Sequence, residues 1–288
     1  MIFETSVGTG ARIGRPATVR GFTGAGGVCD HDMVISGRIG FWLAAIAALA
    51  LAGASCGTTQ HAIDTELAKC LPADTLVAAG VNLDQARQSP LFAKLPASAR
   101  AIADPFDRAT YLLVAFNGKE LITAARGDFR GNAPAGTTLL SANVAIAGRH
   151  PAGSGAPPAD LLTQAESVAA GHAIWIIARG TATLPLTGNA QNINRLLHMA
   201  DTVSLGADLH SGLTLDSVAQ CSTPEAARGF EESLRALLSL TVPGLRLRQP
   251  ELAALLQSAT IERRDRTVHA ALSAGPGTAA QLLDFFGR

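Results

Sequence analysis

Aromatic residues, charges and cysteines are all scarce in this chain of 288 residues. Aromatic side chains make up 5% of the sequence and charged ones 16%, whereas hydrophobic residues make up 48%. A chain of this composition can bury a sizeable core, built mainly from Leu, Val, Ile and Ala, so wholesale disorder is excluded. Its 23 basic residues are balanced by 23 acidic ones. The basic surface that bulk binding of nucleic acid requires is therefore lacking.

Motifs of several enzyme and metal-site classes are also missing. The sequence contains no CxxC pair and no Cys/His cluster with zinc spacing. The nearest approach to a GxSxG nucleophile elbow, at residues 153–155, lies in a Pro/Gly-rich stretch without a preceding strand. Asp208, His210 and Ser211 are close in sequence, but on a predicted hairpin they favour a solvated turn over a catalytic triad. We therefore expect no cofactor and no metal, and favour a protein that is not an enzyme.

Three further patterns are expected to have no special role. The tripeptide Arg-Gly-Asp at residues 126–128 matches an integrin-binding motif, but short tripeptides often arise by chance. The charged tip at Arg263–Arg266 favours a solubilising turn over a contact for an acidic partner or a lipid head group. The histidines lack metal-ligand spacing and are expected to be surface or hydrogen-bonded side chains: His150, His172, His198 and His269.

A short apolar run between Met33 and Cys56 carries the strongest signal of the chain. Arg38 is its only charge, the apolar run Phe41–Leu51 follows, and small residues precede Cys56. This order is typical of a secretory signal, and the run is shorter than the roughly 20 residues that span a bilayer. Residues 33–55 are therefore predicted to be a signal segment; an anchor that stays uncleaved is the competing interpretation.

Residues 1–32 differ from this signal segment. They are rich in glycine and arginine and show no periodic apolar face. A signal normally starts within a few residues of its positive segment. Translation is therefore expected to begin at Met33, which makes residues 1–32 a mis-assigned leader.

The segment GASC, which ends at Cys56, resembles the lipobox of bacterial lipoproteins. Ala54 and Ser55 fit that motif, whereas Gly53 stands where Leu is usual. The resemblance implies that Cys56 is lipidated and that a lipid anchor attaches the mature chain to a membrane. Ordinary cleavage after Ala54 is the alternative, and either process places the chain outside the cytoplasm. Gly57 in place of Asp after the cysteine resembles outer-membrane lipoproteins, which implies the periplasmic side of the cell envelope.

Two cysteines remain in the mature chain once Cys29 and Cys56 are assigned to the leader and the lipobox. In an oxidising compartment, Cys70 and Cys221 could form a disulfide. Alternatively, both could be buried thiols that behave as small hydrophobic side chains. The sequence leaves these two possibilities open.

Strands and helices alternate after a predicted tether at residues 56–70. Asn117-Gly118 predicts a tight hairpin, because this pair favours turns with positive φ. Strands are expected over 76–83, 111–116, 120–126, a pair ending near 147, then 173–179, 203–209, 213–221 and both arms of 260–273. Helices are expected from Ser89-Pro90, over 159–170, 189–200, 223–240 and 250–256, and from Thr278.

The two halves of the mature chain repeat one order of elements: strand, helix, hairpin, strand pair, helix. Residues 71–171 form the first unit and residues 172–288 the second. The helix at Thr223–Leu240 has no counterpart in the first unit. We therefore expect an α+β fold of two similar antiparallel-sheet units, related by internal duplication, with helices packed on one face.

Two stretches of the sequence resemble a group of bacterial envelope lipoproteins without an established activity. These are LPADTLVAAGVNLDQARQSPLFAKL, at Leu71–Leu95, and TPEAARGFEESLRALLSL, at Thr223–Leu240. The resemblance implies no catalytic motif. We therefore favour a non-enzymatic binding or structural module whose partner is an envelope protein or a hydrophobic ligand. A periplasmic hydrolase with a site in the cleft between the two units is the alternative.

Overall fold

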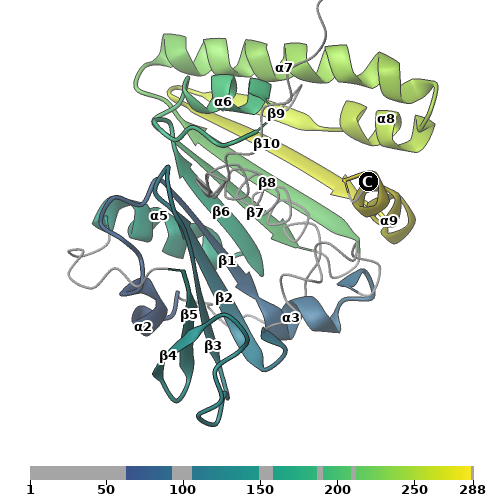
Figure 1. Ribbon diagram of the computed structural model, residues 1–288. Helices are drawn as coiled ribbons and strands as arrows, with labels where there is room; N and C mark the ends of the chain where they lie inside the picture. The colour runs from purple at the N-terminus through teal and green to yellow at the C-terminus, as the bar shows by residue number, and fades with distance from the viewer. Residues whose placement is uncertain (1–62, 93–105, 149–157, 187–190, 209–211, 287–288) are drawn as a thin grey trace, which may run out of the picture.

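The computed structural model describes residues 63–92, 106–148, 158–186, 191–208 and 212–286. Cys56, the predicted leader and the predicted signal segment lie outside these residues. The described chain forms one antiparallel sheet in the order β4-β5-β3-β2-β1-β6-β7-β8-β10-β9 (Figure 1). The α+β class is thereby confirmed. No described helix is long and apolar enough to cross a membrane.

The strands largely follow the apolar runs of the sequence. They are β1 (Val77–Asn82), β2 (Ala109–Phe116), β3 (Leu121–Gly127), β4 (Thr138–Ser141), β5 (Val144–Ala147), β6 (Ile174–Arg179), β7 (Thr202–Asp208), β8 (Leu213–Gln220), β9 (Thr260–Arg264) and β10 (Thr267–Ala274). The helices are α2 (Thr65–Ala68), α3 (Leu83–Gln88), α5 (Ala159–Ala169), α6 (Gln191–Leu197), α7 (Pro224–Arg246), α8 (Pro250–Gln257) and α9 (Pro276–Phe286).

The two predicted units are the two halves of a single sheet. From the centre outward, one half runs β1-β2-β3-β5-β4 and the other runs β6-β7-β8-β10-β9. The halves join where β1 and β6 pair antiparallel, with Val77 opposite Ala178 and Val81 opposite Ile174. A continuous ladder of backbone hydrogen bonds therefore occupies the seam between the units.

Helices cover both faces of this sheet, so the expectation of helices on one face is wrong. We call the face that carries Leu112 and Ile174 face A, and the face that carries Leu113 and Trp175 face B. Helices α3, α8 and α9 contribute to the face A cluster, and α2 and α5 contribute to the face B cluster. The reason is that β1 is buried along both sides, and a strand that is apolar on both sides needs a cover on each.

The outer strands of the second half leave part of face B open. Helix α7 packs over β9 and β10 on face A, where Phe230 contacts Ala219 and Val268. On face B the same strands carry polar, exposed side chains: Gln220, Glu262, His269 and Ser273. This polar strip adjoins α5, which lies over β6 and β7.

The first half differs from the sequence-based predictions at one helix start and at one turn. The helix expected from Ser89-Pro90 instead begins at Leu83, where the side chain of Asn82 accepts a hydrogen bond from the backbone N–H of Gln85 at 3.1 Å. Ser89 ends that helix, because the residue before a proline is disfavoured in the α conformation.

The predicted hairpin at Asn117-Gly118 is present, but its turn is longer than expected. The side chain of Asn117 accepts hydrogen bonds from the backbone N–H groups of Lys119 and Glu120, at 3.0 and 2.9 Å. Of the pair, Gly118 alone has a positive φ, of 95°. A side-chain-stabilised loop therefore replaces the two-residue turn in which both residues have positive φ.

Residues 63–70, which the sequence placed in the tether, belong to the fold. Ile63 is 3% exposed and Leu67 is fully buried, and both lie in the face B cluster. The side chain of Asp64 caps α2 by accepting hydrogen bonds from the backbone N–H groups of Glu66 and Leu67. The folded part of the chain therefore includes Ile63.

Candidate functional site

A polar pocket of about 740 Å³ lies at the end of the sheet where β6 and β8 finish and β7 begins. Five parts of the chain line it: α5, the end of β6, the segment from α6 to β7, the end of β8 and the β9–β10 turn. Its charged side chains are Asp160, Arg179, Asp201 and Arg266, and its polar ones include Gln164, Thr181, His198 and Gln220.

Arg179 and Asp160 form the ion pair on one side of this pocket. One terminal nitrogen of Arg179 donates to both carboxylate oxygens of Asp160, at 2.6 and 2.7 Å. The pair ties the first turn of α5 to the end of β6. The Nε of Arg179 is buried without a hydrogen-bond partner among the described residues. The charge of Arg179 is therefore balanced by Asp160.

Backbone contacts build the floor of the pocket. The N–H of Gly180 donates to the carbonyl of Asp201 at 2.8 Å, and the N–H of Asp201 donates to the carbonyl of Gln220 at 2.7 Å. A Cβ at Gly180 would lie 1.7 Å from the carbonyl oxygen of Ala200. Glycine is therefore required for this close approach, which fixes the position of Asp201 beside β6 and β8.

A histidine–aspartate pair lies at the other end of β7. The Nδ1 of His172 is 2.7 Å from one carboxylate oxygen of Asp208, and the other oxygen accepts from the backbone N–H of Ala173 at 3.1 Å. The imidazole lies against Gly206, where a Cβ would meet the ring. The hydrogen bond to Asp208 raises the pKa of His172, the charge of Asp216 adds to this effect, and burial opposes it.

This pair differs from the grouping considered in the sequence. Asp208 contacts His172, whereas His210 and Ser211 lie outside the described residues. Among those residues, the imidazole of His172 is hydrogen-bonded to Asp208 alone. The arrangement orients a histidine, but the described chain brings no serine or cysteine nucleophile to it.

The His172–Asp208 pair predicts a pH-dependent stability. The pKa of His172 is raised in the folded state above the ordinary 6.5. Its contribution is therefore complete below the unfolded pKa and disappears as the pH rises through the folded pKa. We expect Asp208→Asn to reduce the free energy of unfolding more at about pH 5.5 than at about pH 8, measured by urea denaturation. Equal losses at both values would contradict the pairing, and His269→Asn, at an exposed histidine, is the matched control.

The disulfide considered for Cys70 and Cys221 is not formed. Both thiols are free and buried. Cys70 packs with Leu67 in the face B cluster, whereas Cys221 packs with Phe230 in the cluster beneath α7. Burial raises the pKa of each thiol. The alternative of two buried thiols therefore describes the structure, because the two cysteines belong to separate packing clusters.

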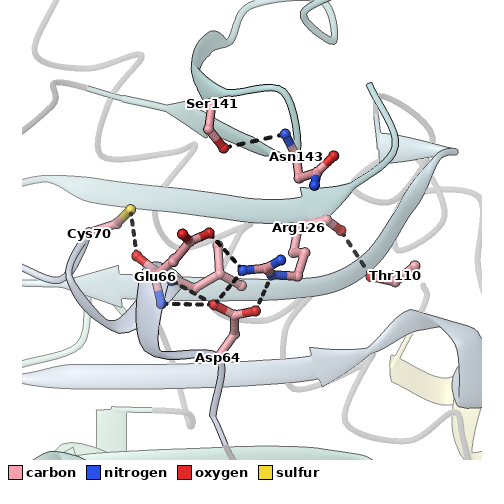
Figure 2. A network of polar contacts seen from close by, with 8 residues as sticks. Asp64, Glu66, Cys70, Thr110, Arg126, Ser141 and Asn143 are labelled. Carbon is pink, nitrogen blue, oxygen red and sulfur yellow. Dashed lines mark hydrogen bonds and ion pairs between the residues drawn. The ribbon is translucent and has the colours of Figure 1, made fainter. Parts of the chain in front are cut away.

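Arg126 fastens the N-terminal segment to the sheet. From β3, its guanidinium pairs with Asp64 and with Glu66, the latter at 2.7 Å, as Figure 2 shows. Asp128 pairs instead with Arg130 at 2.8 Å. The arginine of the Arg-Gly-Asp tripeptide is thus engaged within the protein, and this tripeptide is a structural feature.

The charged tip at Arg263–Arg266 is partly structural as well. Arg263 donates to Glu231 of α7 at 3.0 Å, and Arg235 of α7 donates to the carbonyl of Ile261 at 2.8 Å. These contacts hold α7 on β9. Arg266 is the member of the tip that reaches the polar pocket.

The sequence analysis named three residues of this pocket for other reasons, His198, Cys221 and Arg266, but none of its other charged side chains. Asp160, Arg179 and Asp201 lie in different elements, and their spacing matches no catalytic or metal motif. The described residues contain no group of three or more side chains suited to hold a metal ion. The sheet order brings these residues together, so no short-range pattern could have revealed them.

Comparisons with known proteins add a limited likeness. No protein-family model matches the chain, and no curated protein matches it. One solved structure that resembles it is crystal form I of TP0453. The match covers 75% of this chain and 98% of that one, with 10% sequence identity and a TM-score of 0.40. A similarity of this size carries no argument about function.

Proposed function

We propose that the chain is an exported, lipid-anchored protein of the bacterial cell envelope that acts as a non-enzymatic binding module. Export and anchoring rest on the signal-like segment and on the lipobox-like sequence that ends at Cys56. The observation that carries the binding role is the polar pocket of about 740 Å³, which has the size of a small-molecule site. Its partner is a ligand or a segment of another envelope component.

We also infer that the two halves arose by duplication. The strand order outward from the centre is the same in both, and β1 and β6 have six residues each. A helix follows the central strand in each half, as α3 and α6. The pair α7–α8 occupies the connection from β8 to β9, where the first half has a short loop from β3 to β4.

We favour the binding role over the hydrolase alternative, which places a site in the cleft between the two units. Along the seam β1 and β6 pair continuously, and Trp175 and Ile177 of β6 are buried beneath α5. The polar pocket lies at the end of the sheet, where Asp160 and Gln164 of the first predicted unit meet lining residues of the second. Of its two carboxylates, that of Asp160 is already paired with Arg179, which favours binding over acid–base hydrolysis. The lining is mainly polar, which argues against a hydrophobic ligand.

Lipidation predicts the outcome of one substitution. Cys56→Ala should abolish incorporation of a radiolabelled fatty acid and release the protein from the membrane fraction, because a lipid chain on Cys56 is the expected anchor. Fractionation, labelling and mass spectrometry of the mature N-terminus measure the result. Ser55→Ala, which keeps a small residue before the cysteine, is the control. A native protein that starts intact at Met1 would contradict the export proposal.

In-cell crosslinking tests the binding role. A photo-crosslinking amino acid at Gln164, in the pocket, should give an adduct of higher mass after irradiation. The same amino acid at Gln257, exposed on α8 over the opposite face, should not. Combining the Gln164 probe with Asp201→Ala should weaken the adduct. Equal labelling from both positions would contradict a specific site.

A further inference from the structure

The charges of the polar pocket cancel. Two carboxylates, of Asp160 and Asp201, face two guanidinium groups, of Arg179 and Arg266. Asp160 and Arg179 neutralise each other directly, at 2.6 Å. The pocket therefore offers no excess charge that would select an anion or a cation over a neutral molecule.

Its unused hydrogen-bonding groups are of both kinds. The side chains of Gln164, Thr181 and Asp201 form no hydrogen bond to another described residue, although all three line the pocket. Asp201 offers acceptors alone, whereas the amide of Gln164 and the hydroxyl of Thr181 each both donate and accept. Arg266 approaches Asp265 only to 3.9 Å, so its guanidinium keeps donors for a ligand.

A ligand that suits such a wall must donate and accept at many points without a net charge. Hydroxyl groups do both, and a molecule with several of them can satisfy carboxylate, amide and guanidinium groups together. The pocket of about 740 Å³ exceeds the need of a single sugar ring and falls in the range of sites for larger ligands.

We propose that this pocket binds a neutral, hydroxyl-rich ligand of the oligosaccharide class. The proposal rests on the binding role proposed above and specifies its ligand chemistry. Asp201 accepts from sugar hydroxyls, Arg266 donates to them, and Gln164 bonds from α5 on the opposite wall. The ion pair of Arg179 and Asp160 holds that wall in place.

Isothermal titration calorimetry of the full-length Cys56→Ala chain tests this ligand class. The neutral probes are maltotriose, cellotriose and N,N′-diacetylchitobiose. Trigalacturonate is the anionic comparator of similar size, and dodecanoate is the apolar one. We expect at least one neutral probe to bind with a dissociation constant of about 1 mM or lower, and both comparators to bind at least about tenfold more weakly.

Pocket variants separate a specific site from weak surface binding. Asp201→Ala and Gln164→Ala should each weaken binding of the neutral probe, raising its dissociation constant by about tenfold or more. Glu251→Ala and Gln257→Ala, at exposed positions on α8, should leave the dissociation constant of the neutral probe unchanged. The far-ultraviolet circular dichroism of all four variants should match that of the parent.

Two results would overturn the ligand class. One is a dissociation constant above about 10 mM for every neutral probe, and the other is tighter binding of trigalacturonate or dodecanoate than of the neutral probes. A crosslinked adduct from Gln164 alongside either result would leave the binding role standing and reject only the oligosaccharide. Loss of both the adduct and the calorimetric signal would reject the binding role itself.

Discussion

Replacing Trp175 with alanine is expected to lower the free energy of unfolding by about 3–5 kcal/mol, the usual cost of removing a buried aromatic side chain. Trp175 is 1% exposed at the centre of the sheet, in the face B cluster. Its Nε1 donates to the hydroxyl of Tyr111 at 2.8 Å. Tyr111 is partly buried, and burial raises its pKa to about 12. The substitution also removes the hydrogen-bond partner of its hydroxyl. Urea denaturation measures the loss.

The contact between Trp175 and Gly80 provides a stringent control for this prediction. A Cβ at Gly80 would lie 2.3 Å from the indole, so Gly80→Ala alone should be destabilising. In the Trp175→Ala background the added methyl group has room, and Gly80→Ala should cost less or become favourable. A double-mutant cycle should therefore show strong coupling between these neighbours. Additive losses would mean that the two residues do not pack as described.

The second large effect is expected at Phe230 on α7. Phe230 is 6% exposed and packs with Ala219, Cys221 and Val268. Phe230→Ala should therefore cost about 3–5 kcal/mol, measured by urea denaturation. The control is Glu232→Ala on the exposed side of the same helix, where the ion pair with Arg228 at 2.9 Å is solvent-exposed, so that its loss should change the free energy of unfolding little. Similar losses for both variants would mean that α7 is not held by its apolar stripe.

The sequence of helix α7 predicts its local features but not its contact with β9. Thr223, the first residue of the helix expected over 223–240, caps α7 by accepting from the backbone N–H of Ala226 at 3.1 Å, and Phe230 is buried. Glu231 accepts from both Arg235 and Arg263. These arginines lower the pKa of Glu231. The helix predicts its cap and its apolar stripe, but Arg263 comes from β9, which the spacing of residues along α7 cannot reveal.

Sequence patterns likewise locate individual strands but do not reveal how the strands pair in the sheet. Apolar runs and alternation located β1, β6 and β7 to within a few residues, because these patterns reflect the local backbone. The pairing of β1 with β6 joins segments almost 100 residues apart, and an apolar strand does not encode its neighbour. The polar pocket and the pair of His172 with Asp208 depend on that arrangement, so no short-range pattern indicates them.

The pairing of Arg126 with Asp64 and Glu66 has a consequence for distance. Because residues 63–70 are bound to the sheet, a lipid on Cys56 is separated from the fold by seven residue steps, which extend to at most about 25 Å. Freeing this segment as far as Leu71 would roughly double that reach, to about 50 Å. Under the proposed anchoring, the guanidinium group of Arg126 and the buried side chains of Ile63 and Leu67 together limit how far the protein can extend from its membrane into the surrounding compartment.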